Sequence, residues 1–143
     1  MLYPEYDQKE YIIDGANICG MEFNSRIKFR IKNLLLVIEK LTTLGAHKEN
    51  IIIICDATLR HKIDDPNKYY RLKKQGIILE SPAGIKADKF ILNYCLSHSN
   101  CLIISNDLFK EYYDQLPDAH WIKIHRIGVL KIKNDILLVP MQD

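Results

Sequence analysis

The stretch Tyr11-Ile12-Ile13-Asp14-Gly15-Ala16-Asn17 places a carboxylate directly after a short hydrophobic run, and a glycine directly after the carboxylate. Such a run predicts a buried strand that ends at Asp14. In open α/β sheets the ligand crevice lies just beyond the carboxyl ends of the strands. Asp14 is therefore the first candidate for a functional side chain. Asn17, three residues later, is expected to position a ligand or the Asp14 side chain, or to form a local Asx turn.

Apolar segments of strand length alternate with segments of helical periodicity along the rest of the chain. This alternation predicts an α/β fold: a mostly parallel central sheet of about five strands, flanked by helices, with a C-terminal hairpin. We expect one domain over residues 1–143 with its core at about 11–126. The expected strands are 11–13, 51–55, 77–79, 101–104 and 121–125; the expected helices are 25–43, 66–74, 86–98 and 107–113; the hairpin lies within 129–139 and turns at Asn134-Asp135.

Further carboxylates stand at other strand-to-helix junctions. Asp88 lies in Lys86-Ala87-Asp88-Lys89, and Asp107 and Glu111 follow the fourth expected strand. Because such junctions of a parallel sheet share one edge, we expect these side chains to converge there with Asp14. Converging carboxylates repel one another unless a cation lies between them, and hard oxygen ligands suit Mg²⁺ or Mn²⁺.

Each acidic residue also has a purely structural interpretation. Asp14 could close a turn after its strand, Asp107 could cap the helix expected at 107–113, and Asp88 could be a solvated acid in a first helical turn. Asp107 and Glu111 would share one face of that helix, where two like charges destabilise it by a few tenths of a kcal/mol. A bound cation would reverse the sign of that interaction.

Several other chemistries lack their signatures in this sequence. The five histidines show no H-x-x-x-H spacing, no serine lies in a G-x-S-x-G element, and no Gly-rich phosphate loop is present. The longest apolar runs are far below the roughly 20 residues that span a bilayer, so we expect no membrane partner. The four cysteines form no C-x-x-C pair, which favours reduced thiols in a cytoplasmic protein.

The net charge is only +2, but the segment from Arg60 to Lys74 holds six basic residues against two acidic ones. A local surplus of this kind fits contacts with phosphate groups. The residues expected to bind substrate are Arg60, Lys68, Arg71 and Lys86. For Lys73 and Lys74 a solvated helix face is an equally good interpretation.

With these residues placed, the chain resembles the NYN branch of the PIN-like ribonucleases, most closely the catalytic domain of the CCCH zinc-finger endoribonucleases called Regnase or MCPIP. The resemblance spans about residues 11–116, and the Ser-Asn-Asp tripeptide is its most specific element. The similar stretches are Ile12-Ile13-Asp14-Gly15-Ala16-Asn17, Leu59-Arg60, Ala87-Asp88-Lys89-Phe90-Ile91 and Ile104-Ser105-Asn106-Asp107-Leu108-Phe109-Lys110-Glu111.

The resemblance implies a three-layer PIN-like (NYN) fold and cleavage of single-stranded RNA by a Mg²⁺- or Mn²⁺-dependent endoribonuclease. It also allows a homodimer. The residues expected to be catalytic are Asp14, Asn17, Asp88, Asp107 and Glu111, and those expected to hold the metal are Asp14, Asp88, Asp107 and Glu111.

Two departures from the family pattern leave alternatives open. Ala87 stands where the family often has the first of two adjacent Asp residues, and Glu111 replaces a shorter Asp. One alternative is therefore a PIN-like module that binds RNA or protein and whose acidic site has decayed. A more distant alternative is a metal-dependent phosphatase, which would share the acidic pocket but would not need the basic flank.

Overall fold

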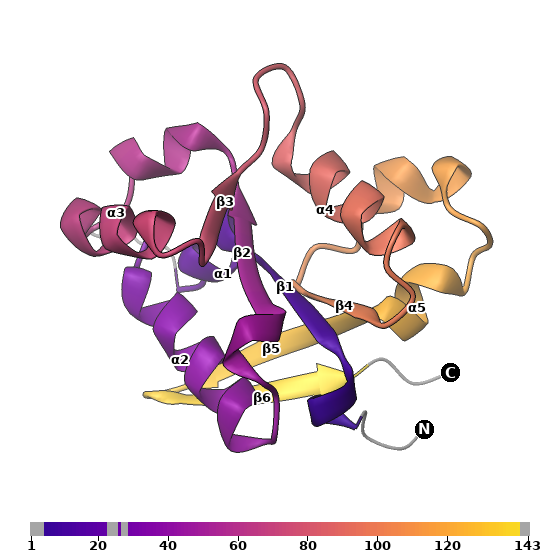
Figure 1. Cartoon of the computed structure of the whole chain (residues 1–143), viewed down its shortest axis with the longest axis horizontal. Helices are drawn as coiled ribbons and strands as arrows, with labels where there is room; N and C mark the ends of the chain where they lie inside the picture. The colour runs from indigo at the N-terminus through magenta and orange to yellow at the C-terminus, as the bar shows by residue number, and fades with distance from the viewer. Residues whose placement is uncertain (1–4, 23–25, 27–28, 141–143) are drawn as a thin grey trace.

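One mixed sheet crosses the molecule and separates two groups of helices (Figure 1). The computed structural model describes residues 5–22, 26 and 29–140. The strands are β1 (Glu10–Asp14), β2 (Ile51–Cys55), β3 (Ile78–Glu80), β4 (Cys101–Ile104), β5 (Arg126–Ile132) and β6 (Asp135–Pro140). Their order across the sheet is β3-β2-β1-β4-β5-β6. Neighbouring strands are parallel except β5 and β6, which form an antiparallel hairpin.

The helices connect these strands. The α-helices are α1 (Gly15–Cys19), α2 (Ile31–Thr43), α3 (Pro66–Lys74), α4 (Ala87–Leu96) and α5 (Trp121–His125). The 3₁₀ segments are η1 (Tyr6–Gln8), η2 (Lys48–Asn50), η3 (Ala57–His61) and η4 (Lys110–Gln115). Figure 1 shows α2 and α3 on one side of the sheet and α4 and α5 on the other. No described helix combines the length and apolar composition that crossing a membrane would require.

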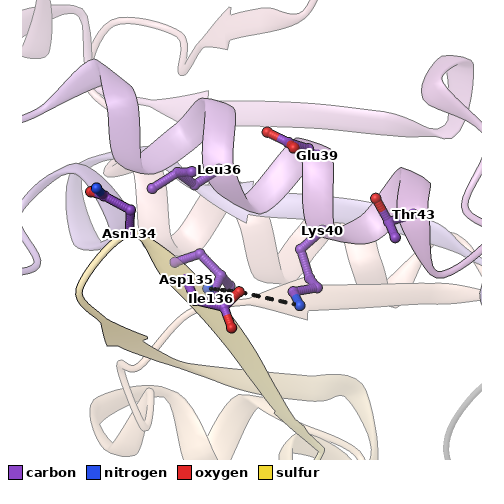
Figure 2. Close-up of a pocket in the computed structure, with 7 residues that line it drawn as sticks. All are labelled: Leu36, Glu39, Lys40, Thr43, Asn134, Asp135 and Ile136. Carbon is purple, nitrogen blue, oxygen red and sulfur yellow. Dashed lines mark hydrogen bonds and ion pairs between the residues drawn. The ribbon is translucent and has the colours of Figure 1, made fainter.

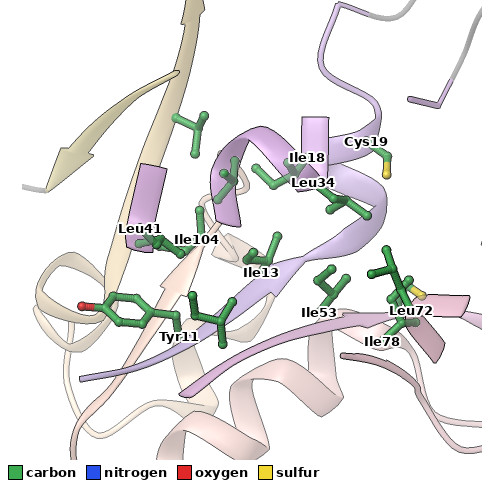
Figure 3. Close-up of a cluster of buried hydrophobic side chains, with 14 of the residues drawn as sticks. Tyr11, Ile13, Ile18, Cys19, Leu34, Leu41, Ile53, Leu72, Ile78 and Ile104 are labelled. Atoms are coloured by element: carbon green, nitrogen blue, oxygen red, sulfur yellow. The ribbon is translucent and has the colours of Figure 1, made fainter. Parts of the chain in front are cut away.

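The core consists of two clusters, one on each face of the sheet. Tyr11 and Ile13 of β1 belong to the cluster shared with α2 and α3, part of which is drawn in Figure 3. Ile12, which lies between them in sequence, belongs to the cluster shared with α4 and α5. Successive side chains of a strand point to opposite faces, so a strand covered on both faces is apolar throughout. This explains the uninterrupted apolar runs of β1, β2 and β4.

The strand order reverses between β1 and β4. The chain runs from β1 through β2 to β3 toward one edge, and then returns so that β4 lies on the other side of β1. The connections that leave β1 and β4 therefore diverge to opposite faces of the sheet. In doubly wound folds a divergence of this kind leaves a crevice at the carboxyl ends of the two strands.

Helix α3 is the element whose start and end are best defined by local sequence signals. Pro66 occupies its first turn, and the Asp65 side chain accepts a hydrogen bond from the Lys68 backbone N–H at 3.0 Å. Gly76 follows the helix with a φ of +80°, a conformation that favours glycine. The predicted bounds of α3, β2 and β4 are confirmed, and all four cysteines are free and buried.

Other element bounds differ from expectation. The helix expected at 25–43 begins at Ile31, where the Asp64 carboxylate accepts a hydrogen bond from the Ile31 N–H at 2.9 Å; residues 25, 27 and 28 lie outside the described residues. The strand expected at 77–79 and the helix expected at 86–98 are present at Ile78–Glu80 and Ala87–Leu96. The hairpin turns at Lys133 and Asn134, one residue earlier than predicted.

The prediction of a fifth strand at 121–125 is wrong. These residues form the single-turn helix α5, which buries Trp121 and Ile122 against the second core cluster. The strand that pairs with β4 begins only at Arg126. Apolar residues at positions 122 and 124 fit the two-residue period of a strand, but over five residues that period does not distinguish a strand from one helical turn.

Candidate active site

Asp14 lies at the end of β1 in a nearly closed environment. Its side chain is only 7% exposed, and its Oδ2 accepts a hydrogen bond from the Ser105 hydroxyl at 2.8 Å. Gly15 is required beside it, since a Cβ there would lie 2.9 Å from the Cβ of Cys55 on β2. The hydrogen bond from Ser105 directs the carboxylate toward the end of β4.

Burial raises the pKa of Asp14 to about 6. The negative charges of Asp107 and Asp88 act in the same direction, whereas the hydrogen bond from Ser105 opposes them. Both neighbouring carboxylates must lie near Asp14 to have this effect. The structure therefore brings together three of the four carboxylates expected to hold a metal.

The turn after β4 is built by its own side chains. The Ser105 hydroxyl accepts a hydrogen bond from the Asp107 N–H at 3.0 Å, and Asp107 Oδ1 accepts one from the Phe109 N–H at 2.9 Å. Phe109 is buried and has a φ of +54°, in the left-handed region. These contacts hold Asp107 in an exposed turn above the end of β4.

The prediction of a helix at 107–113 is therefore wrong. Side-chain bonds of Asp107 and Ser105 replace the first helical turn, and the 3₁₀ segment η4 begins only at Lys110. Asp107 is not a helix cap, and it does not share a helix face with Glu111, because it lies outside η4. Glu111 lies exposed in the first turn of η4.

Asn17 and Asn106 join the two sides of the crevice. The Asn17 side-chain oxygen accepts a hydrogen bond from the Asn106 N–H at 2.9 Å, a contact that no expectation named. The Asn106 amide in turn donates to the Val129 carbonyl at 2.9 Å and accepts from the Val129 N–H at 2.8 Å. Asn17 thus helps to fix the turn that carries Asp107.

Asp88 enters the site from the first turn of α4. Its Oδ1 accepts hydrogen bonds from the Tyr112 hydroxyl and from the Lys89 N–H, both at 2.8 Å. Burial raises the pKa of Tyr112, and the charges of Asp88 and Glu111 raise it further. Glu111 therefore lies near the Tyr112 hydroxyl, on the side of the site formed by η4 and α4.

Arg126 places a positive charge under the site. Its guanidinium is buried and donates a hydrogen bond to the Ser105 carbonyl at 2.8 Å. Burial lowers its pKa, while the nearby Asp107 acts in the opposite direction. Sequence reasoning assigned no role to Ser105, Tyr112 or Arg126. The sequence did contain a signal for Arg126, because a lone arginine within a buried apolar segment requires partners for its charge.

The donor atoms suit a hard divalent cation. Among the residues that the structure describes, no three His, Cys, Asp or Glu side chains form a group that could enclose an ion directly. Asp14, Asp88 and Asp107 nevertheless interact electrostatically at one edge of the sheet. Mg²⁺ is commonly held by one or two carboxylates and several waters, so a looser all-oxygen arrangement of this kind fits it.

The basic flank is partly neutralised. Glu80 at the end of β3 pairs with Arg60 at 2.7 Å and with Lys73 at 3.0 Å. Its second oxygen accepts a hydrogen bond from the Tyr69 hydroxyl at 2.7 Å. Arg60, expected to bind substrate, is thus engaged within the protein. The other residues with that expectation are Lys68, which is half-buried, and Arg71 and Lys86, which are exposed.

A hollow of about 240 Å³ lies away from these carboxylates, between α2 and the β5–β6 hairpin (Figure 2). Lys40 and Asp135 form an ion pair across it at 3.5 Å. The residues that line it are Leu36, Glu39, Lys40, Thr43, Asn134, Asp135 and Ile136. None of them was expected to function in catalysis or binding.

Comparison with known proteins matches residues 7–143 to the family described as Zc3h12a-like Ribonuclease NYN domain. Two solved structures of the nuclear proteinaceous RNase P 2 (PRORP2) of Arabidopsis thaliana are similar, with TM-scores of 0.69 and 0.73 and 22% identity. The matched regions cover 94% and 92% of this chain. The same regions make up only 31% and 30% of the two PRORP2 chains. No curated protein matches the chain. At this identity the likeness to PRORP2 establishes the fold.

Proposed function

Because the chain belongs to the Zc3h12a-like ribonuclease NYN domain family, we propose that it is a divalent-metal-dependent endoribonuclease that cleaves single-stranded RNA. The observation that carries this proposal is the buried Asp14 carboxylate at the end of β1, which the Ser105 hydroxyl joins to the turn that carries Asp107. Burial and the charges of Asp107 and Asp88 raise its pKa. A protein that crowds carboxylates in this way at the switch point of its sheet has a site that a cation would stabilise.

In this proposal Asp14, Asp88, Asp107 and Glu111 hold Mg²⁺ or Mn²⁺, directly or through water. A bound ion of this kind lowers the pKa of water and neutralises charge that develops on the phosphate. The Ser105 hydroxyl orients Asp14, and Asn17 steadies the turn that carries Asp107. Arg126 limits the net negative charge beneath the site.

The nearer rival is a module with a decayed acidic site. Ala87, at the position where relatives often carry a further Asp, is buried at the start of α4 and offers no ligand. We propose that Asp14, Asp88, Asp107 and Glu111 suffice without a further Asp, since Mg²⁺ is usually held by only one or two carboxylates together with waters. A homodimer stays a prediction of the resemblance, and a cytoplasmic location stays a prediction from the cysteine pattern.

The test is cleavage of end-labelled single-stranded RNA in Mn²⁺ and in EDTA, by wild type and by Asp14→Asn. Wild type should cut internally only with metal, and the variant should lose all cleavage above background. Asp114→Asn, which alters an exposed carboxylate of η4, is the matched control and should cut normally. Cleavage in EDTA, or by folded Asp14→Asn, would refute the proposal. RNA binding without cutting would favour the decayed module, and hydrolysis of a simple phosphomonoester would favour the phosphatase.

A further inference from the structure

The outward face of α3 carries an exposed aromatic ring between basic side chains. Tyr69 and Leu72 are buried, so the opposite side of α3 faces solvent. The residues that a 3.6-residue period places on that outer side are Asn67, Tyr70, Arg71 and Lys74, and all four are exposed. Tyr70 is 64% exposed, more than any other described tyrosine, tryptophan or phenylalanine.

The same helix separates its basic residues into two groups. Lys73 is held by Glu80, and Lys68 is half-buried. Arg71 and Lys74 form no ion pair within 4.0 Å with any described carboxylate. The basic side chains available to a ligand are therefore those beside the Tyr70 ring, because Lys73 is paired with Glu80 at the end of β3.

We propose that Asn67, Tyr70, Arg71 and Lys74 form a second binding site for single-stranded RNA, termed the α3 face. One base stacks on the Tyr70 ring, and Arg71 and Lys74 contact the phosphates on either side of it. Base–aromatic stacking combined with neighbouring cations is how proteins hold single strands without reading their sequence. RNA is the ligand for two reasons. The positive side chains of the α3 face complement the charge of phosphates, and the proposed function, on which this inference rests, makes RNA the substrate.

The position of α3 sets the length of RNA that can use this site. α3 packs beside β3, and β3 is separated from β1 by β2. With strands about 4.8 Å apart and a helix packed about 10 Å away, the α3 face lies roughly 20 Å from Asp14. Only an RNA of several nucleotides can reach both places. The α3 face should therefore strengthen binding of long substrates and leave the chemical step unchanged.

Binding is measured in EDTA, where no cleavage is expected, by fluorescence anisotropy of a labelled 20-nucleotide oligouridine. Tyr70→Ala should bind the oligonucleotide about tenfold more weakly, because the loss of one base–aromatic stack weakens binding by about that much. Tyr70→Phe keeps the ring and should bind within about twofold of wild type. Arg71→Ala with Lys74→Ala should lower the slope of log K against log salt by about 1.4, the sum for two single-strand phosphate contacts.

The control for charge is Lys123→Ala with Lys133→Ala, two exposed lysines of α5 and of the β5–β6 turn; β5 is separated from β3 by β2, β1 and β4. This pair should leave the salt slope unchanged. Circular dichroism and urea unfolding establish that each variant is folded.

Cleavage in Mn²⁺ gives a separate measurement. With the 20-mer, Tyr70→Ala should raise KM about tenfold at unchanged kcat, and with a tetranucleotide neither constant should change. Loss of all cleavage by wild type would refute the proposed function but not the α3 face, which the binding measurement in EDTA decides alone. The inference is overturned if Tyr70→Ala binds the 20-mer like wild type, if Tyr70→Phe loses as much as Tyr70→Ala, or if the lysine control loses the same salt slope.

Discussion

At the level of single residues, Asp14 is placed where its own charge is unfavourable. The folded protein keeps the Asp14 proton up to about pH 6, whereas an ordinary aspartate releases it near 3.8. Between these values the folded state binds more protons than the unfolded state, so stability falls as the pH rises. Above pH 6, ionised Asp14 lowers the free energy of unfolding by about 3 kcal/mol in the absence of a cation.

We therefore expect Asp14→Asn to be more stable than wild type in EDTA at pH 7 to 8, by up to about 3 kcal/mol. Asparagine keeps an oxygen that can accept the Ser105 hydrogen bond but never ionises. The gain should shrink as the pH falls from about 6 and should vanish only well below pH 3.8, where the carboxyl is protonated in both states. Urea unfolding across this pH range measures it.

Asp114→Asn is the control for that experiment, since it makes the same substitution at an exposed carboxylate. A constant difference between Asp14→Asn and wild type at every pH would show that packing, and not ionisation, is responsible. A gain in stability together with a loss of cleavage is typical of a residue kept for function at the expense of the fold.

At the level of elements, the contact between η4 and α4 positions Asp88. The Tyr112 hydroxyl donates to Asp88 at 2.8 Å, and the Tyr112 ring is buried in the second core cluster. Tyr112→Phe should lower the free energy of unfolding by only about 1 kcal/mol, the net value of one hydrogen bond. Because Asp88 would then be free to rotate, we expect Mn²⁺ to bind several-fold more weakly.

Isothermal titration with Mn²⁺ and the metal dependence of cleavage measure this loss. Tyr94→Phe is the matched control: Tyr94 also lies against the second core cluster, but its hydroxyl forms no hydrogen bond with a described residue. Metal affinity equal to that of wild type in Tyr112→Phe would mean that Asp88 is oriented by α4 alone or holds no metal.

The elements also show how far the sequence could be interpreted. β2, β4 and α3 were predictable because apolar runs, Pro66 and Gly76 act through near neighbours. The turn after β4 was not, since Asp107 forms local side-chain bonds that compete with a helix. The bond from Ser105 to Asp14 spans 91 positions, and a single sequence gives no indication of such a pair. The sequence indicated that carboxylates gather at one edge, but not which hydroxyl or guanidinium holds them there.

At the level of the whole molecule, metal binding should be coupled to stability. A ligand that binds only the folded state stabilises it by RT ln(1 + [L]/Kd), about 2.7 kcal/mol at a hundredfold excess over Kd. Mg²⁺ or Mn²⁺ should therefore raise the melting temperature of wild type, and Asp107→Ala should abolish the increase. Differential scanning fluorimetry with and without EDTA measures it. Equal shifts in both proteins, or none in either, would argue against a specific acidic metal site.

The 91 positions between Asp14 and Ser105 also have a consequence for the protein while it is being made. The pairing of β1 with β2 closes a short segment, whereas its pairing with β4 closes a segment about twice as long and requires residues that are synthesised later. A nascent chain that ends before β4 can contain β1, β2 and β3 but has neither Ser105 nor Asp107. The proposed nuclease centre therefore forms only when β4 joins the sheet, so a nascent chain that ends before β4 is not expected to cleave RNA.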